Sequence, residues 1–177
     1  MDLNFYFKAG FASRIIETEL DRYTNFFENT YKENLEHCKK VIEDFPRWSI
    51  ISGYYAMHDI TKLFLAKEFR IKIDFNVHRI TLEILKKIIK DEKILELLEI
   101  GYKEFIEMAN DLAEARKERT RAQYYTGSEF MKKKYQEDAK KFLDNVVVLY
   151  LNKMEVLIKW YQIFLIRILL EYYLFFL

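Results

Sequence analysis

The residues whose types and spacing are best suited to chemistry lie in the stretch 112–125, which reads LAEARKERTRAQYY. Its cations and phenols are Arg116, Lys117, Arg119, Arg121, Tyr124 and Tyr125. A guanidinium group can bind two phosphate oxygens at once, and a phenol ring can stack on a base or donate to a phosphate. The stretch therefore predicts phosphate or RNA binding. The structural alternative is that these cations only oppose the dipole at a helix C-terminus.

A second group of cations, Lys132-Lys133-Lys134, follows the break at Thr126-Gly127. Between residues 114 and 134 the chain has seven cations and three acids, which leaves a local charge of +4. The whole chain has 29 cations and 28 acids, so global charge does not predict nucleic-acid binding. Any such binding must come from this local patch. A solvated helical corner with no ligand is the other interpretation.

The composition indicates a helical protein of one domain. The chain has 177 residues, of which 51% are hydrophobic, but only four glycines and one proline. Few turn residues favour long helices over a sheet with many tight turns. The single cysteine excludes an internal disulfide and fits a reducing cytoplasm, and the N-terminal residues do not have the pattern of a signal peptide. The abundance of Lys, Glu, Ile and Tyr resembles thermophile composition.

Apolar residues recur every three to four positions in most of the chain. The pattern predicts helices over 13–45, with Ser13 as N-cap and Pro46 as the end, and over 47–69. After a polar link at 70–74, Asn76 and Asp91 are predicted caps of a short helix and of a longer helix that runs into the arginine stretch. Small residues at 52, 53 and 56 would let a neighbouring helix approach closely.

The last helix is predicted to begin with the capping box Thr126-Gly127-Ser128-Glu129 and to run to the C-terminus. Its apolar stripe is expected at Ala139, Phe142, Val146, Leu149, Tyr150, Lys153 and Leu157. The fold class is therefore all-α: an antiparallel up-and-down bundle of about five helices without a sheet and with a long C-terminal helix. We expect one domain over 1–177, comprising a bundle at 13–150 and a helical extension at 151–177.

Residues 156–177 are long enough to span a membrane, but polar and charged residues interrupt them. Each charge near the centre of a span costs about 2.5 to 3.5 kcal/mol on insertion scales. The interrupting residues are Lys159, Gln162, Arg167 and Glu171. We therefore expect no membrane span, and a helix whose apolar surface packs on its own bundle or on a second subunit.

The three histidines offer little for metal binding. His37 and Cys38 are adjacent, so on a helix they point about 100° apart. His58 has no second ligand four residues away, which favours a core histidine bonded to a neighbour. A metal-dependent hydrolase would require His58 and the distant His78 to converge. We therefore predict no metal and no cofactor.

The segment WSIISGYYAMHDITKLFLAKEFRIKIDFNVHRITLEIL at 48–85 resembles the central helix pair of the HEPN family (higher eukaryote and prokaryote nucleotide-binding domains). The matching features are Tyr54-Tyr55-Ala56-Met57 and a histidine, His78, near the start of the next helix. The later AEARKERTRAQYY resembles the branch of that family in which a helix ends in spaced arginines. The resemblance covers about residues 13–150.

The resemblance implies a dimeric helical bundle. HEPN domains include metal-independent ribonucleases of toxin–antitoxin or defence systems, and many have a minimal nucleotidyltransferase partner. Their ribonuclease motif is an Arg, four to six residues, and a His; here Tyr124 stands five residues after Arg119, and no His follows His78. A phenol with a pKa of about 10 is a poor substitute for imidazole in proton transfer at neutral pH.

We therefore predict a non-catalytic homodimer that binds a nucleotide, RNA or a protein partner. The predicted binding residues are Arg116, Arg119, Tyr124 and Tyr125, which are expected to line a groove where two subunits meet. Arg116 and Arg119 are three residues apart and so share a helix face. The alternative is a ribonuclease toxin with an altered motif, for which Arg119 and Tyr124 are the candidate catalytic residues.

Overall fold

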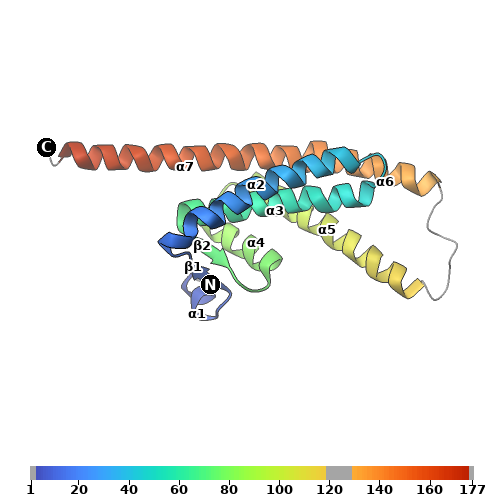
Figure 1. The fold of residues 1–177 in the computed structure, drawn as a ribbon, viewed down its shortest axis with the longest axis horizontal. Helices are drawn as coiled ribbons and strands as arrows, with labels where there is room; N and C mark the ends of the chain where they lie inside the picture. Colours follow the sequence, from blue (N-terminus) through green and yellow to red (C-terminus); the bar gives the residue numbers. More distant parts are fainter. Residues whose placement is uncertain (1–2, 119–128, 176–177) are drawn as a thin grey trace.

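A computed structural model of the chain describes the backbone of residues 3–118 and 129–175, and the side chains of residues 3–107 and 133–163. In chain order the elements are α1 (Leu3–Lys8), β1 (Ala12–Arg14), α2 (Glu17–Val41), α3 (Pro46–Phe69), β2 (Ile71–Ile73), α4 (Val77–Ile88), α5 (Glu92–Glu118), α6 (Glu129–Phe142), the π-helix η1 (Leu143–Val147) and α7 (Val148–Phe175). Figure 1 shows a helical bundle in which α2, α3 and α7 run along the long axis. The prediction of an all-α bundle with a long C-terminal helix is confirmed.

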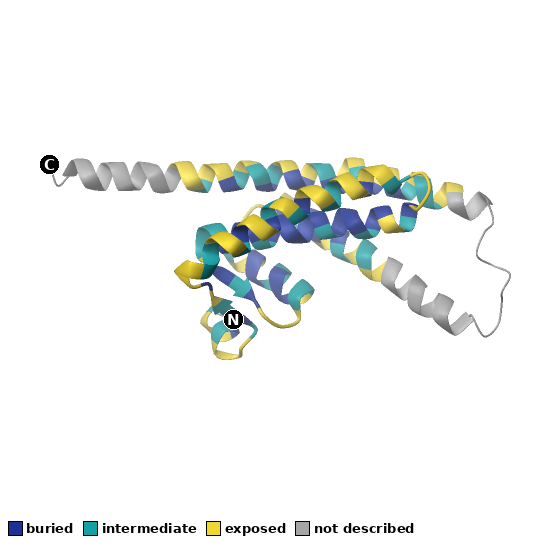
Figure 2. Cartoon of the chain, in the orientation of Figure 1, coloured by how far each residue is buried: buried dark blue, intermediate teal, exposed yellow. Residues whose placement is uncertain are grey.

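Helix α3 is the centre of the bundle. It packs against α2, α4, α5, α6, η1 and α7, and most of its residues are buried (Figure 2). It begins with Pro46, which suits a first helical position because proline lacks the N–H that would be unbonded there. It ends where Arg70 adopts a left-handed conformation with φ of 54° and its N–H bonds to the carbonyls of Ala66 and Leu65. The predicted limits, 47–69, are confirmed to within one residue.

The small residues in the first half of α3 allow close packing, as predicted. A Cβ added to Gly53 would lie 2.9 Å from Cγ2 of Val147 in η1 and 3.2 Å from Sγ of Cys38 in α2. Ser52 and Ala56 on either side are buried. Helices α2 and η1 can therefore reach α3 here only because residue 53 has no side chain.

The N-terminal region corrects three predictions: the absence of a sheet, the helix cap at Ser13 and the end of the first long helix at 45. Ser13 is not a helix cap but the middle residue of β1, which pairs antiparallel with β2 in the register Ala12↔Ile73, Ser13↔Lys72 and Arg14↔Ile71. Ile16 is the N-cap of α2, and α2 ends at Val41, four residues before the predicted end at 45. The link at 70–74 contains a strand because the alternation of Ile71 and Ile73 buries both side chains beside Ala12 in the core.

The two predicted caps differ in outcome. Asp91 caps α5, since its Oδ1 accepts a hydrogen bond of 3.1 Å from the N–H of Ile94. Asn76 does precede α4, but its side chain makes no cap hydrogen bond to any described residue. It instead has a positive φ of 48°, which asparagine tolerates better than most residues do. Its role is to turn the backbone into the helix.

The C-terminal stripe changes its phase at η1. Ala139, Phe142 and Val146 are buried as predicted, but Leu149 is 45% exposed. From Val147, the last residue of η1, the buried residues continue with Tyr150, Leu151, Met154 and Ile158. A π turn holds one residue more than an α turn, so the apolar stripe continues one position later in the sequence. The predicted stripe, which assumed an unbroken α-helix, is therefore wrong at Leu149, whereas Tyr150 is buried and Leu157 is partly buried against the core.

Helix α7 crosses the predicted boundary at 150/151 without a break. Over the described residues, none of the helices is both long and apolar enough to cross a membrane. The outer side of α7 carries Leu149, Val156, Trp160 and Ile163, and all four are exposed. Within the described part of the chain, the bundle therefore leaves one apolar side of α7 uncovered.

Candidate functional site

The predicted binding residues lie at or beyond the limits of the described chain. Arg116 is in the last turn of α5, which ends at Glu118, but its side chain is not described. Arg119, Tyr124 and Tyr125 lie outside the described residues, as do Thr126, Gly127 and Ser128 of the capping box, whose last residue Glu129 begins α6. Beyond this gap, Lys133 and Lys134 of α6 are exposed. The groove formed by the arginines and tyrosines stays a prediction.

Two histidines that are far apart in the sequence meet between α3 and α4. His58 is buried in the middle of α3, and His78 lies in the first turn of α4. Their ring centroids are 4.7 Å apart at an angle of 38°. The convergence that a metal site would require therefore occurs.

Aromatic side chains surround this histidine pair. Tyr54 Oη and His78 Nδ1 form a hydrogen bond of 2.8 Å, and the Phe105 ring of α5 stacks on Tyr54 with its centroid at 4.6 Å. Tyr55 and Tyr102 also lie against the His78 ring. The Tyr-Tyr-Ala-Met segment and the histidine of the family resemblance thus belong to a single cluster, which fixes α4 and α5 to α3.

Burial is the main reason that both histidines stay neutral at neutral pH. Burial lowers the pKa of His58, against the opposing effect of Asp59. Burial, followed by the charges of His58 and Lys62, lowers the pKa of His78 to about 4. Asp59 itself accepts a hydrogen bond of 3.0 Å from Asn34 Nδ2 of α2. At neutral pH the cluster therefore offers no cationic imidazole to a phosphate.

The partners of His58 differ from those of an ordinary core histidine. Its Nδ1 is 3.9 Å from Asp59 Oδ1, which is too long for a regular hydrogen bond. Its Nε2 is buried without a hydrogen-bond partner of regular geometry among the described residues, although the Val77 backbone is close enough to raise its pKa. The expected hydrogen bond to a neighbouring side chain is thus absent from the described part of the chain.

The chemistry available to the cluster is limited. Among the described residues, no three His, Cys, Asp or Glu side chains come close enough together to hold a metal ion. His78 is only partly buried, but its Nδ1 is already bonded to Tyr54. The arrangement therefore suits the positioning of three helices better than proton transfer to a substrate. Local spacing could not reveal the convergence, because residues 58 and 78 meet only through the turn between α3 and α4.

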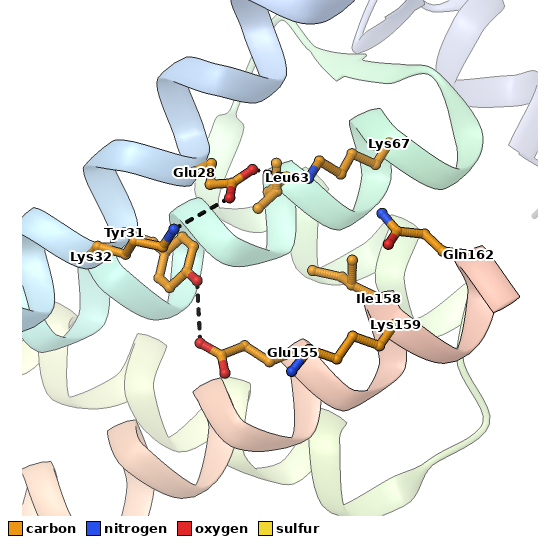
Figure 3. Close-up of a pocket in the computed structure, with 9 residues that line it drawn as sticks. All are labelled: Glu28, Tyr31, Lys32, Leu63, Lys67, Glu155, Ile158, Lys159 and Gln162. Carbon is orange, nitrogen blue, oxygen red and sulfur yellow. Dashed lines mark hydrogen bonds and ion pairs between the residues drawn. The ribbon is translucent and has the colours of Figure 1, made fainter.

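A polar hollow of about 310 Å³ lies between α2, α3 and α7 (Figure 3). Glu28 binds Lys32 at 3.3 Å and Lys67 at 3.0 Å, and the hydrogen bond from Lys67 is the main reason that the pKa of Glu28 is lowered. Across the hollow, Tyr31 donates a hydrogen bond of 3.2 Å to Glu155. The acids of this hollow are thus already bonded to neighbouring side chains, and the network ties α7 to the α2–α3 pair.

A second and larger hollow, of about 440 Å³, is lined by His37, Val41, Phe45 and Trp48 at the α2–α3 turn. In the sequence, His37 has Cys38 as its neighbour, and the local pattern does not connect it with Trp48. The structure leaves the Trp48 side chain 54% exposed beside His37. Trp48 and Ser52 lie one helical turn apart on α3, and His37 lies on the preceding helix. This combination was the sequence signal that could have indicated a polar and aromatic site here.

The chain was compared with models of known families, with curated proteins and with solved structures, and none of them matches it.

Proposed function

We propose that this chain is a non-catalytic, HEPN-like helical protein that acts as a homodimer and binds a nucleotide or RNA through phosphate contacts. The observation that carries the proposal is the hydrogen bond between Tyr54 and His78. It joins the two features matched within the segment 48–85, the Tyr-Tyr-Ala-Met segment and the histidine, which are 24 residues apart in the sequence. The arginine stretch, which is the second part of the resemblance, lies at and beyond the end of α5.

The binding residues of this proposal are Arg116, Arg119, Tyr124 and Tyr125. In its support, α5 reaches Glu118, so Arg116 lies at its C-terminal end. Helix α6 begins at Glu129, and Lys133 and Lys134 in its second turn are exposed. The cations from both sides of residues 119–128 attract the same polyanion, and the binding should weaken with salt.

A second copy of the chain is the proposed partner of α7. Leu149, Val156 and Ile163 are exposed and are seven residues apart, which is the spacing of a coiled-coil seam. Trp160 lies beside this seam with 65% of its side chain exposed. Two such helices, one from each subunit, would cover this apolar side. The resemblance also suggests a minimal nucleotidyltransferase as a further partner and a role in a toxin–antitoxin or defence pair in the cytoplasm.

The alternative function is an altered-motif ribonuclease, with Arg119 and Tyr124 in the catalytic roles. The described histidines do not favour it. The pKa of His78 is lowered and its Nδ1 is bonded to Tyr54, and His58 is buried. Neither is therefore in a good position to replace the motif histidine as a general base.

Fluorescence anisotropy with a labelled single-stranded RNA tests the proposal. We expect binding that falls steeply between 50 and 200 mM salt, as polyanion binding does, and no cleavage of the RNA in EDTA. Arg119→Ala should abolish binding without lowering the melting temperature. The matched control is Arg22→Ala, which removes an exposed guanidinium from α2.

Three outcomes would count against the proposal. If the wild type binds no RNA and no nucleotide at low salt, or if Arg119→Ala unfolds the protein, the arginines have a structural role. If the RNA is cleaved in EDTA and Arg119→Ala stops the cleavage, the ribonuclease alternative is correct. The dimer is tested separately by sedimentation, in which Trp160→Glu should give the mass of one subunit.

A further inference from the structure

The α2–α3 turn carries an open hollow that the proposed function does not use. Its lining comes from the C-terminal end of α2, with His37 and Val41, and from Phe45 and Trp48 at the start of α3. Its volume of about 440 Å³ lies within the range of small-ligand pockets, about 300 to 1,000 Å³. Figure 1 shows this turn beside α6, and Gln136 of α6 donates a hydrogen bond of 2.6 Å to the carbonyl of Glu43. The turn is therefore held in place from behind.

One short hydrogen bond joins the His37 ring to Ser52, and a second joins Ser52 to the backbone of its own helix. Ser52 Oγ lies 2.8 Å from the carbonyl oxygen of Trp48 and 2.7 Å from Nδ1 of His37. A carbonyl oxygen only accepts, so the Ser52 hydroxyl must donate to Trp48. Both contacts then contain a proton only if His37 Nδ1–H donates to Ser52 Oγ. We refer to this arrangement as the Ser52 relay.

The Ser52 relay has a chemical consequence for the other nitrogen of the ring. In a neutral imidazole only one nitrogen carries hydrogen. With the hydrogen on Nδ1, Nε2 is a bare acceptor on the edge of the ring away from buried Ser52, and the exposed His37 lines the hollow. His37, which lines the hollow, therefore carries an acceptor whose direction is set by the bond to Ser52.

The other walls are flat and apolar. The side chains of Phe45 and Trp48 are 61% and 54% exposed. Large exposed aromatic rings next to a fixed polar group are what a ligand with a planar apolar face and a polar edge requires. A purely aliphatic ligand would leave the Nε2 acceptor of His37 without a partner, and a bound anion would be repelled by its lone pair.

We infer that this hollow binds a nucleobase, which stacks on Trp48 and Phe45 and donates an N–H to Nε2 of His37. Adenine has a suitable donor in its exocyclic amine, and every base has a face for stacking. The base can belong to a free nucleoside or to a single-stranded RNA. None of the residues that line this hollow belongs to the proposed phosphate-binding set, so the inference does not rest on the phosphate contacts of the proposed function.

The test uses the fluorescence of Trp48. The chain has two tryptophans, so Trp160→Phe leaves Trp48 as the only one. In this background we expect saturable quenching by 9-methyladenine and at least tenfold weaker binding of 9-methylpurine, which has the same rings but no N–H. A short oligoadenylate and adenosine, titrated in parallel, distinguish RNA from a free nucleoside as the source of the base.

Three variants in the same background separate the parts of the site. His37→Phe should bind both compounds equally, because it keeps an aromatic ring and loses the acceptor. Ser52→Ala should reduce the preference for 9-methyladenine and leave 9-methylpurine binding unchanged, since Ser52 is a positioning residue. The matched control, Phe26→Ala, removes an exposed aromatic ring of α2 and should change neither affinity.

Equal binding of the two compounds by the parent protein, or no saturable quenching at millimolar concentration, would overturn the inference. The test is also independent of the phosphate site. Arg119→Ala should leave 9-methyladenine binding unchanged, so either proposal can fail without the other.

Discussion

Two side chains of α3 make the same pair of hydrogen bonds in opposite surroundings. Ser52 donates to the carbonyl of Trp48 and accepts from His37, at the open end of the helix. Thr61 donates to the carbonyl of Met57 at 2.7 Å and accepts from the hydroxyl of Tyr150 at 2.6 Å. The partner of Ser52 is exposed, whereas the Tyr150 side chain of α7 is fully buried.

The same hydrogen-bond pattern can therefore have different roles. The role depends on whether the residue that donates to Ser52 or Thr61 is exposed, as His37 is, or buried, as Tyr150 is. The Tyr150 phenol uses its only proton on Thr61, and burial raises its pKa, so it stays neutral and has nothing to offer a ligand. His37 uses one nitrogen on Ser52 and keeps a second one for the hollow. The predictions below test this contrast, from the largest expected effect to the smallest.

The buried relay should contribute more to stability than the open one. Thr61→Val keeps the shape of the side chain but leaves the Tyr150 hydroxyl without an acceptor, which should cost about 1–3 kcal/mol. Ser52→Ala should cost less than about 1 kcal/mol, because the exposed His37 can donate to water instead. Urea unfolding at pH 7 measures both. Equal losses would mean that the two surroundings do not differ as described.

The buried histidine pair should make the protein sensitive to acid. The pKa of His78 is about 4 in the folded chain, against about 6.5 when unfolded. Between these values the unfolded chain binds more protons, so the free energy of unfolding falls as the pH is lowered from about 6.5 to about 4. The loss should be about 1–2 kcal/mol, after allowing for the partial exposure of His78.

His78→Asn tests this pH dependence, because an asparagine amide can occupy the place of Nδ1 beside Tyr54. Its unfolding free energy, measured from pH 7 to pH 4, should fall less steeply than that of the wild type. An unchanged slope in the variant would assign the acid sensitivity to other groups.

The two helical glycines of the core should respond differently to alanine. At Gly53 the new methyl group would meet Val147 and Phe142, whereas at Gly101 it would meet the flexible end of Met57. Overpacking costs about 1–3 kcal/mol, and alanine favours a helix over glycine by about 1 kcal/mol. We expect a net loss of about 1 kcal/mol for Gly53→Ala and almost none for Gly101→Ala. Thermal unfolding compares them, and a larger loss at Gly101 would contradict the expectation.

The smallest expected effect is that of His37→Ala on stability. His37 is exposed, and its hydrogen bond to Ser52 can be replaced by water, so the unfolding free energy should change by less than about 0.5 kcal/mol. The same urea titration as for Ser52→Ala measures it. A loss of more than about 1 kcal/mol would indicate that His37 supports the fold and not a ligand.

Local sequence signals predicted the helices well where the cause is local. Asp91 caps α5 because its side chain reaches a backbone N–H three residues ahead. The glycine at 53 predicted the close approach of another helix, because the missing side chain is itself the signal. The strand at 71–73 could not be predicted in the same way, since its hydrogen bonds join it to residues 12–14, about 60 positions earlier.

The clusters around His78 and around His37 form through contacts between different helices. The spacing of residues along the sequence does not predict such contacts. His58 and His78 meet because the β2 segment and the turn at Asn76 fold α4 back on α3. His37 meets Ser52 because α2 and α3 form an antiparallel pair with a short turn. In both cases the sequence predicts the helix on which each histidine lies. The contact partner lies on another helix and depends on how the two helices pack.

The wide turn η1 has a consequence for how this chain tolerates changes in length. Loops usually absorb a deleted residue, but residues 143–147 lie within a helical rod that continues into α7. The N–H of Val148 bonds to the carbonyl of Leu143, five residues back, whereas an ordinary α turn spans four. Removing one residue of η1 would convert the π turn into an α turn and leave α7 in its orientation, with Tyr150 still facing Thr61. A deletion within an α-helical part of the rod would instead rotate the residues beyond it by about 100°, so η1 is a place where the 28-residue helix α7 can lose a preceding residue and keep the same side toward the interior.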